Sequence, residues 1–480
     1  MKVTRRRTLF HQRRTSNLYR LFFLAIFVLA GVWFIMRLGT GEIRNPFSPT
    51  PTSTRTINSF VLEGNASFDA GNLNAAIEAY QQATEVDPSN AQVWAELARI
   101  QAYSSSLLSN DSDRLSRLEE ALASADQAIA LAPEESNVLA IHAFVLDWNA
   151  DPNLDALRSG DKKAADFIFK AEQDAAHALT VDNQNPLALA FSAEILVDQQ
   201  KWTQAGQYIQ QAVEFGPQVM DVHRVYGVYL ESTENYNQAI EEYQQALAIN
   251  PNLTFLYISI GQNYRTLALK SIVDSQKAQL YNSALENFAK AATIDAQLNI
   301  NNPLPYLAIA KTYAQQGEFF AAALNAQKAI EVNPTNADLY GQLGMIYKSG
   351  RNFETSILAL RCAIEGCTAA ESCEARNAGS DCVGVEIQPL SLNPNSANYY
   401  LNLGSVLSAF APNKPEYCTE VNSLLTLLKN TYPNDTVMIR NADVGLGICA
   451  EVTASLTQTP VTTPSITTVA TPSSNYTLQP

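Results

Sequence analysis

Cysteine is absent from the first three quarters of the chain. All six cysteines lie between Cys362 and Cys449, and four of them fall within "RCAIEGCTAAESCEARNAGSDC", residues 361–382. Successive cysteines are 5, 6, 9, 36 and 31 positions apart, so no C-x-x-C pair occurs. A structural zinc site or a thioredoxin-like redox motif would favour such a pair. The pattern therefore favours disulfides, provided that this part of the chain lies in an oxidising compartment.

Histidine is scarce, and no catalytic signature is present. The four histidines, His11, His142, His177 and His223, are far apart in the sequence, and all precede the first cysteine. The chain has no G-x-S-x-G, Walker, Rossmann, H-E-x-x-H or haem-attachment motif. We therefore expect no enzymatic activity, no cofactor and no bound metal.

One stretch has the alternation of a calcium loop but lacks its essential residues. In "DWNADPNLD", residues 147–155, acidic and amide side chains occupy alternate positions. A calcium loop needs glycine at its sharp turn and glutamate as its last ligand, but Pro152 and Arg158 stand at those positions. We interpret this stretch as a polar loop between two helices.

Charge is absent from "LFFLAIFVLAGVWFIM", residues 21–36, which is apolar throughout. With its flanking residues this run is long enough for a helix across a bilayer about 30 Å thick. Seven basic and no acidic residues precede Leu21, so the positive-inside rule predicts a cytoplasmic N-terminus and an extracytoplasmic remainder. A cleaved signal peptide is the alternative, with small enough residues at Val28–Ala30, but the run stays apolar beyond them. We favour an uncleaved signal-anchor helix at residues 21–37 of a single-pass protein of the cell membrane.

Large apolar side chains are sparse on both sides of the main part of the chain. Residues 38–56 and 452–480 are rich in Pro, Ser and Thr. We predict an extended linker for the first and a disordered tail for the second, either carrying O-linked sugars or remaining a plain polar tail. The net charge is −15 although residues 1–20, the predicted cytoplasmic tail, are basic, so the chain beyond the anchor is acidic. Such a chain is unsuited to binding nucleic acid through bulk charge.

Between these ends the sequence repeats with a period of 34 residues. "NYNQAIEEYQQALAINPN", residues 235–252, has relatives at residues 72–90 and 318–336. The pattern resembles the tetratricopeptide repeat (TPR) family. The resemblance covers roughly residues 57–451. It implies an all-α fold, a right-handed solenoid of about nine TPR helix pairs with a C-terminal capping helix. This solenoid would follow the one transmembrane helix predicted from the apolar run.

The residue types within one repeat explain the pattern. Gly227 and Ala239 are small where helices approach most closely, Tyr243 fills the space between them, and Pro251 ends the second helix. No single pair buries its apolar face, so neighbouring pairs must stack. Extra residues enlarge the second, third, sixth, eighth and ninth pairs. The pairs are predicted to begin near Thr56, Ala91, Ser136, Pro186, Met220, Thr254, Pro303, Ala337 and Ala397, and the cap to span Thr436–Glu451.

The eighth pair contains a cysteine-rich insertion at about residues 366–391, because the turn expected after its second helix is delayed. We expect disulfides to staple this insertion to itself and to its parent helix. The favoured long-range pair is Cys418–Cys449, which would tie the last full pair to the cap, and the sequence does not choose among the other pairings. The candidates for disulfides are Cys362, Cys367, Cys373, Cys382, Cys418 and Cys449.

In the TPR family the first helices line a concave groove that binds extended peptides or partner helices. Four cations on first helices would form a basic stripe suited to an acidic peptide or a carboxylate terminus, unless they pair with neighbouring acids. We therefore expect a membrane-anchored scaffold for a protein or peptide partner. The alternative is a ligand-binding receptor or enzyme whose site is built from the repeat insertions, which requires their polar residues to converge. The candidate groove residues are Glu194, Arg224, Gln262, Arg265, Lys311 and Lys348.

Overall fold

The computed structural model describes residues 17–39, 56–158, 160–161, 163–379 and 381–457. The chain divides into two units at Thr56. In the described part every regular element is a helix, and the only β-type pairing is an isolated bridge between Cys367 and Ile387. The prediction of an all-α fold is therefore confirmed. Most of the predicted basic tail, most of the predicted linker and most of the predicted C-terminal tail lie outside the described residues.

The first unit contains helix α1, Leu18–Gly39, which covers the predicted anchor at residues 21–37. Among the described residues, no helix combines the length and the apolarity that a membrane span requires. The uncharged stretch between Arg20 and Arg37 has sixteen residues, about 24 Å of helix at about 1.5 Å per residue. The segment is thus helical as predicted, but its assignment as a membrane span is not supported.

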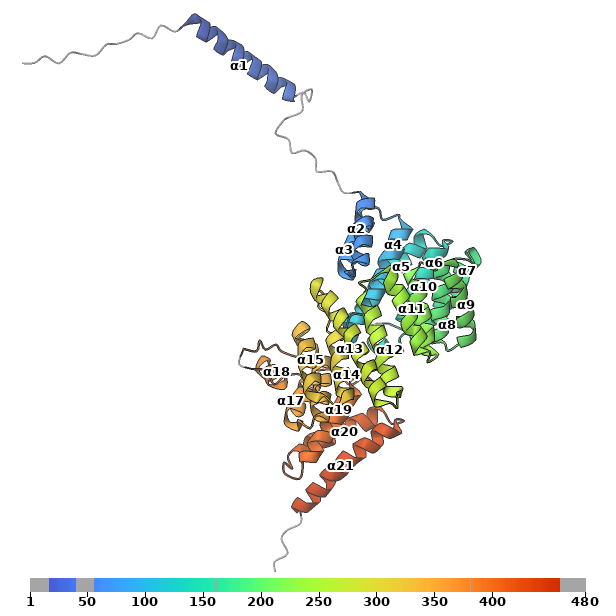
Figure 1. Cartoon of the computed structure of the whole chain (residues 1–480). Coiled ribbons are helices and arrows are strands. Elements are labelled where there is room, and N and C mark those ends of the chain that lie inside the picture. The colour runs from blue at the N-terminus through green and yellow to red at the C-terminus, as the bar shows by residue number, and fades with distance from the viewer. Residues whose placement is uncertain (1–16, 40–55, 159, 162, 380, 458–480) are drawn as a thin grey trace, which may run out of the picture. The chain divides into compact units, whose positions relative to one another are not determined.

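The second unit is a series of antiparallel helix pairs, in which each helix packs on the next (Figure 1). The first helices of these pairs are α2 (Ile57–Asp69), α4 (Ala91–Ser105), α6 (Ser136–Asn149), α8 (Pro186–Asp198), α10 (Met220–Ser232), α12 (Thr254–Lys270), α14 (Leu304–Gln316), α16 (Ala337–Ser349) and α19 (Ala397–Phe410). The second helices are α3 (Leu73–Val86), α5 (Asp111–Leu131), α7 (Ala164–Val181), α9 (Trp202–Phe215), α11 (Tyr236–Ile249), α13 (Asp274–Gln297), α15 (Phe319–Val332), α17 (Phe353–Ile364) and α20 (Tyr417–Thr431). Each predicted first helix starts within one residue of the observed start.

Three further helices stand outside this alternation: the short 3-10 helix η1 (Pro152–Leu154), α18 (Ala369–Ala375) and α21 (Thr436–Thr457). Helix α21 packs on α19 and α20 at the end of the solenoid, as expected of a cap, and extends beyond the predicted end at Glu451. Helix η1 lies in the polar loop predicted between α6 and α7.

Asparagines in the turns cap three of the first helices, α4, α8 and α16. The side chain of Asn90 accepts a hydrogen bond from the backbone N–H of Val93 at 3.2 Å, and that of Asn336 accepts one from Asp338 N–H at 3.0 Å. An N-cap of this kind satisfies one of the free N–H groups of the first turn. The Asn that closes motifs such as "VNPTN" therefore serves as the cap of the following helix.

Close approach of two helices explains the glycine of the fifth pair. A Cβ built on Gly227 of α10 would lie 2.5 Å from the ring of Tyr243 on α11. Tyr243 is only 2% exposed. Ala239 and Ala246 on the same helix are fully buried. The predicted division between small contact residues and a large filling residue is confirmed here.

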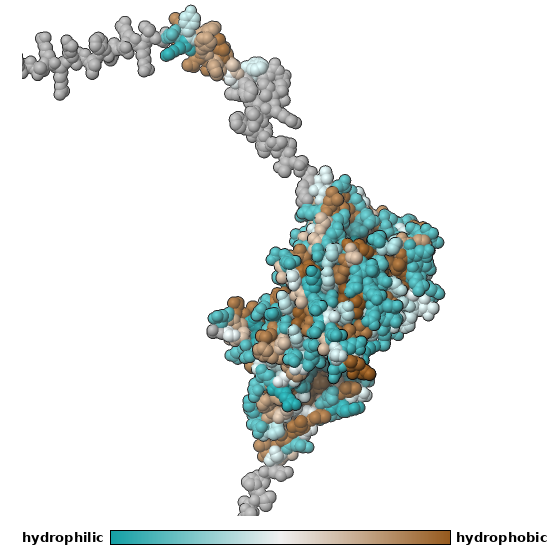
Figure 2. All heavy atoms as spheres, in the orientation of Figure 1, coloured by the Kyte–Doolittle hydropathy of each residue, from teal (hydrophilic) through white to brown (hydrophobic). Residues whose placement is uncertain are grey.

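The apolar core consists mainly of two large clusters. One extends over α2–α12 and the other over α14–α21. A small cluster of Ala284, Phe288, Ala308 and Ile309 packs at the junction of α13 and α14. Figure 2 shows hydrophilic side chains over much of the visible face of the solenoid, with hydrophobic patches between them.

The solenoid folds back so that early helices contact late ones. Asn250, after α11, donates a hydrogen bond to Asp69 at the end of α2 at 2.7 Å. The loop between α4 and α5 reaches further, because Asn336 donates to Ser109 at 2.8 Å and Asn395 donates to Asp111 at 2.7 Å. These contacts place the loop after α4 against the turns that precede α16 and α19.

The six cysteines form three disulfides, Cys362–Cys367, Cys373–Cys382 and Cys418–Cys449. The first two staple the segment between α17 and α19, whose ends are also joined by the bridge between Cys367 and Ile387. The third joins α20 to the cap α21 and is the long-range pair favoured from the sequence. Spacing alone does not give the other two pairings.

Candidate functional site

Two of the predicted groove residues, Arg224 on α10 and Glu194 on α8, are buried and not available to a partner. Their side chains are only 5% and 7% exposed, and the guanidinium donates two hydrogen bonds to the carboxylate at 2.7 and 2.5 Å. Burial alone would lower the pKa of Arg224, but Glu194 and its other neighbours raise it well above the ordinary value. The prediction that these residues line an open groove is therefore wrong, because other helices cover them.

The covering residues come from α4, whose Tyr103 precedes Arg224 by 121 positions in the chain. Arg224 Nε donates to the hydroxyl of Tyr103 at 3.1 Å, and that hydroxyl donates to Asp221. Arg99 forms an ion pair with Asp221 at 3.0 Å. We call Arg99, Tyr103, Glu194, Asp221 and Arg224 the polar cluster.

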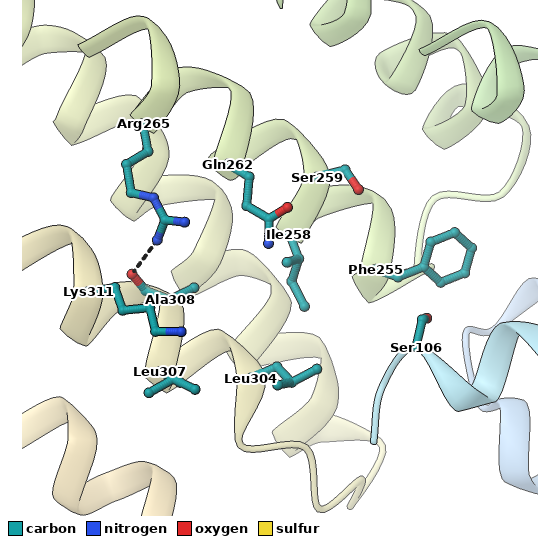
Figure 3. Close-up of a pocket in the computed structure, with 10 residues that line it drawn as sticks. All are labelled: Ser106, Phe255, Ile258, Ser259, Gln262, Arg265, Leu304, Leu307, Ala308 and Lys311. Carbon is teal, nitrogen blue, oxygen red and sulfur yellow. Dashed lines mark hydrogen bonds between the residues drawn. The ribbon is translucent and has the colours of Figure 1, made fainter. Parts of the chain in front are cut away.

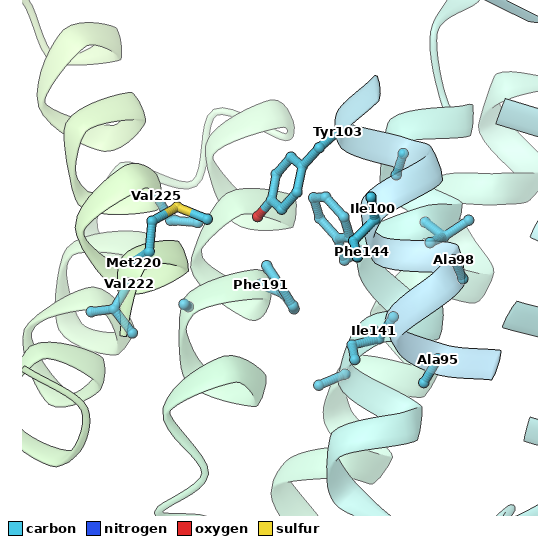
Figure 4. Packing of buried hydrophobic residues seen from close by; sticks show 14 of the residues in the cluster. Ala95, Ala98, Ile100, Tyr103, Ile141, Phe144, Phe191, Met220, Val222 and Val225 are labelled. Atoms are coloured by element: carbon cyan, nitrogen blue, oxygen red, sulfur yellow. The ribbon is translucent and has the colours of Figure 1, made fainter. Parts of the chain in front are cut away.

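Aromatic rings enclose the polar cluster. The guanidinium carbon of Arg224 lies 5.3 Å from the ring centre of Tyr103 and 5.5 Å from that of Phe144, within the range of cation–π attraction. In Figure 4 Tyr103 projects from α4 toward the helix that carries Met220 and Val225, with Phe144 behind it. The concave face formed by α4, α6, α8 and α10 is thus filled by its own side chains.

The concave face remains open further along, at a cavity of about 270 Å³ between α12, α14 and the end of α4. We call it the α12–α14 pocket. Figure 3 shows Gln262 and Arg265 on α12, Lys311 on α14, and Ser106 facing them from the segment after α4. Three predicted groove residues therefore come together here. The lining residues are Ser106, Phe255, Ile258, Ser259, Gln262, Arg265, Leu304, Leu307, Ala308 and Lys311.

The filled and open parts of the concave face share a wall. The ring of Phe255, which lines the pocket, stacks on the ring of Tyr103 with the centres 5.3 Å apart. Since Tyr103 also belongs to the polar cluster, closure of the earlier helices sets the position of one side of the pocket.

The two cations of the α12–α14 pocket, Arg265 and Lys311, form no ion pair with the described residues. Arg265 donates to the carbonyl oxygen of Ala308 at 3.5 Å. Among the described residues, no carboxylate lies within 4.0 Å of the charged nitrogens of Arg265 or Lys311. Burial lowers the pKa of both side chains, and the neighbouring charge of Arg265 lowers the pKa of Lys311 further, against an opposing effect of Asp338. An anion bound here would offset both the burial of the two charges and the repulsion between them.

Lys348, the last predicted groove residue, lies apart from this pocket. Its Nζ donates to Asn402 Oδ1 on α19 at 2.6 Å, and burial lowers its pKa. The predicted basic stripe is therefore interrupted: Arg224 is buried, Arg265 and Lys311 share a pocket, and Lys348 contacts the ninth pair.

Residues from three insertions meet at a second cavity, of about 540 Å³, whose polar lining comes mainly from the second and eighth pairs. It is lined by the loop around Asp111, by Leu157 of the third pair and by residues 388–396 of the eighth. Tyr399 donates to Asp338 at its edge, at 2.5 Å, and burial is the main reason that the pKa of Asp338 is raised. We call this cavity the insertion pocket.

No metal centre or histidine site emerges from the described residues. Nowhere among them do three His, Cys, Asp or Glu side chains assemble into a group that could hold a metal ion. His142 is fully buried and lies 3.0 Å from Asp126 and 2.7 Å from Asp174. In the calcium-like stretch, Asp151 accepts a hydrogen bond from Asn153 N–H at 2.9 Å and so caps η1.

Three stretches of the chain match models of known repeats. Residues 64–102 match a TPR repeat, and residues 192–253 and 325–357 match a tetratricopeptide repeat. These stretches correspond to α2–α4, α8–α11 and α15–α17. No curated protein sequence matches the chain.

Several solved structures with a similar fold are distant in sequence. A tetratricopeptide repeat protein from Parabacteroides merdae is 17% identical, and the match covers 60% of this chain and 98% of that one, with a TM-score of 0.33. The human IFIT1 dimer with PPP-AAAA is 16% identical, with coverages of 83% and 92% and a TM-score of 0.48. A monomeric mutant of IFIT1 with m7Gppp-AAAA is 14% identical, with coverages of 89% and 86% and a TM-score of 0.50. At these identities the likeness concerns the fold alone.

Proposed function

Since this chain belongs to the tetratricopeptide repeat family, whose repeats form interaction scaffolds, we propose that it binds an acidic segment or carboxylate terminus of a protein partner in the α12–α14 pocket. The observation that carries the proposal is the pairing of Arg265 with Lys311 in one cavity without a carboxylate partner among the described residues. We further propose that about nine helix pairs between residues 57 and 451 are TPR units.

The rest of the pocket suits a peptide end. Gln262, Ser259 and Ser106 offer hydrogen-bonding groups, while Phe255 and Leu307 supply apolar walls. A carboxylate held by two partly buried cations makes charge-assisted hydrogen bonds, which are stronger than neutral ones. The adjacent apolar walls would take a hydrophobic side chain next to the terminal carboxylate.

The test is a calorimetric titration of the full chain with an eight-residue acidic peptide that ends in a free carboxylate, and with its amidated form. The proposal predicts that the double variant Arg265→Glu/Lys311→Glu loses binding, whereas Lys290→Glu, at an exposed lysine on α13, binds like the wild type. Equal binding by the two variants would overturn the proposal. An RNA oligonucleotide of the PPP-AAAA type belongs in the same series, because IFIT1 was solved with that ligand and the acidic charge of this chain predicts no binding.

A second candidate is a ligand-binding receptor whose site is the insertion pocket. The observation that favours it is the convergence of the second, third and eighth pairs, held by Asn336 on Ser109 and Asn395 on Asp111. Replacement of Asn395 by Ala would loosen this convergence without touching the α12–α14 pocket. A ligand lost by Asn395→Ala and retained by Arg265→Glu/Lys311→Glu would support the receptor.

The location of the protein is a separate proposal. Three disulfides are typical of an oxidising compartment, which supports an extracytoplasmic position for the second unit. We propose that α1 attaches the chain to the membrane, on the grounds that side chains such as Phe27 and Leu18 are more than four-fifths exposed and require apolar surroundings. Resistance of the protein to extraction by alkaline carbonate, lost on deletion of residues 21–36, tests the attachment. Protease digestion of the repeats on intact cells tests whether the second unit lies on the extracytoplasmic side of the membrane.

A further inference from the structure

The largest of the cavities described here, about 810 Å³, shares the lining residue Ser106 with the α12–α14 pocket. It is formed where α4, α6 and α8 end and where α5 and α7 begin. We call it the acidic pocket. Its lining residues are Ser105, Ser106, Leu108, Arg114, Leu118, Asp147, Trp148, Ala150, Asp151, Pro152, Ala164, Ala165, Ile168, Asp198 and Gln199.

Two buried oxygen atoms on the wall of the acidic pocket have no donor. Oδ1 of Asp147, a residue 4% exposed, and Oε1 of Gln199 make no hydrogen bond to any of the residues that the structure describes. Most buried polar atoms in folded proteins have a partner, and a buried acceptor without one costs free energy. Two such acceptors on one cavity wall point to a ligand that donates.

The charges around the cavity indicate which kind of donor. Asp151 is neutralised by its ion pair with Arg114. Glu194, which does not line the cavity, is neutralised by its ion pair with Arg224. Asp147 and Asp198 have no cation of their own among the ion pairs of the described residues. Burial and the neighbouring carboxylates raise the pKa of both side chains, that of Asp198 to about 6. The cavity therefore holds two carboxylates whose ionised forms lack a counter-charge.

The helix ends add to the negative potential. Helices α4, α6 and α8 all end at this cavity, and the C-terminal end of a helix carries a partial negative charge. The starts of α5 and α7, two helix ends against three, act in the opposite sense. Because the described residues offer no group of three His, Cys, Asp or Glu side chains suited to a metal ion, an organic cation with several N–H donors fits this wall better than a metal.

The apolar part of the lining suits the stem of such a cation. Trp148, Leu118 and Ile168 face the cavity together with the acidic residues. Aromatic faces attract cations, and long cationic side chains bury their methylene groups against apolar surface. The volume lies within the usual range for small-ligand sites, about 300–1,000 Å³.

We propose that the acidic pocket binds an ammonium or guanidinium group, with the carboxylates of Asp147 and Asp198 and the amide oxygen of Gln199 as acceptors and Trp148 along its aliphatic stem. The group belongs either to a free amine or to a Lys or Arg side chain of a polypeptide. This site is distinct from the anion-binding pocket proposed above and does not depend on it.

The test titrates the full chain at pH 7.5 with agmatine and with an end-blocked peptide that contains a single arginine, using the citrulline peptide as the neutral control. Binding of both cationic probes identifies a site open to free amines, and binding of the arginine peptide alone identifies a polypeptide ligand. Asp147→Asn and Asp198→Asn should each weaken binding at least about tenfold, the loss expected for one hydrogen bond to a charged group. Glu286→Gln, at an exposed residue of α13, should bind like the wild type.

A stability readout separates a binding role from a structural one. If Asp147 is held ready for a ligand, Asp147→Asn removes a buried unpaired charge and raises the melting temperature of the free protein, while the cationic probe no longer raises it further. A variant that melts lower and binds agmatine normally would overturn the proposal. Failure of the wild type to bind either cationic probe, or binding of the citrulline peptide equal to that of the arginine peptide, would overturn it as well. If Asp147→Asn does not fold, Asp198→Asn, at a more solvent-accessible position, replaces it: normal binding of agmatine by a folded Asp198→Asn variant would overturn the proposal.

Discussion

Arg224 on α10 and Glu194 on α8 form a two-bond ion pair inside the solenoid, with Nη1 2.7 Å from Oε1 and Nη2 2.5 Å from Oε2. Both residues lie on first helices, as the repeat register requires. They are nevertheless inaccessible, because Tyr103 of α4 covers them. The pair therefore belongs to the interior of the protein and serves its stability.

The first prediction concerns this pair. Arg224→Ala should lower the free energy of unfolding by about 3–5 kcal/mol, because it leaves the carboxylate of Glu194 buried without a counter-charge. Urea denaturation of the two proteins measures the difference. Arg440→Ala, at an exposed position on α21, should change the stability by about 0.5 kcal/mol or less, and equal effects of the two substitutions would contradict burial of the pair.

The second prediction contrasts two helical glycines. Gly227→Ala should lower the free energy of unfolding by about 1–3 kcal/mol, because the added methyl group meets the ring of Tyr243. Gly447→Ala on α21 meets nothing within 4 Å, so it should raise stability by roughly 0.5–1 kcal/mol through helix propensity. Thermal unfolding of both variants checks the sign, and a stabilising Gly227→Ala would show that α10 and α11 do not approach as described.

The third prediction ranks two disulfides. Cys418–Cys449 closes a separation of 31 residues and Cys373–Cys382 one of 9. In the chain-entropy model these loops correspond to about 4 and about 2.5 kcal/mol of stabilisation. The double variant Cys418→Ala/Cys449→Ala should therefore lower the free energy of unfolding more than Cys373→Ala/Cys382→Ala does. Denaturant unfolding of the two variants, each with its remaining disulfides oxidised, measures the difference. The reverse order would mean that the insertion contributes more to the fold than its size suggests.

The fourth prediction concerns pH. Partial burial and Glu194 raise the pKa of Asp198 from 3.8 to about 6, with Arg224 opposing and Asp151 adding to the shift. Burial and the carboxylates of Asp198 and Glu194 raise the pKa of Asp147 as well. The folded protein thus holds this proton more tightly than the unfolded chain. The stability contributed by Asp198 is full below about pH 4 and is lost as the pH rises to about 6.

Comparison with Asp198→Asn reports this effect together with the accompanying change at Asp147, because the remaining titrating groups are common to both proteins. The free energy of unfolding of the wild type relative to the variant should fall between pH 4 and pH 6 and stay level above. Solvent access to Asp198 limits the size of the change. A relative stability that rises over this interval would contradict the raised pKa.

The sequence predicts the fold well because its determinants are local. The glycine at Gly227 and the proline at Pro251 act within one repeat, so they can be identified without knowledge of the rest. The period then gives the helix starts. The Cys418–Cys449 pair could be favoured for a similar reason, since it joins neighbouring elements at the end of the chain.

The site was predicted only in part because it depends on contacts between distant residues. Gln262, Arg265 and Lys311 meet because α12 and α14 are successive first helices, which the register implies. The covering of Arg224 by Tyr103 spans 121 positions, and no feature near either residue indicates it. The same is true of the acidic pocket, where Asp147 and Gln199 come from different pairs.

The most direct test of the account is photo-crosslinking of the full chain with the acidic peptide carrying a photoreactive group next to its terminal carboxylate. If the concave face is filled at Arg224 and open at Arg265 and Lys311, mass spectrometry should find the crosslinks on α12 and α14, and the amidated peptide should give few. Crosslinks concentrated on α8 and α10 would contradict the closed polar cluster. Crosslinks concentrated on residues 388–396 would instead place the peptide in the insertion pocket.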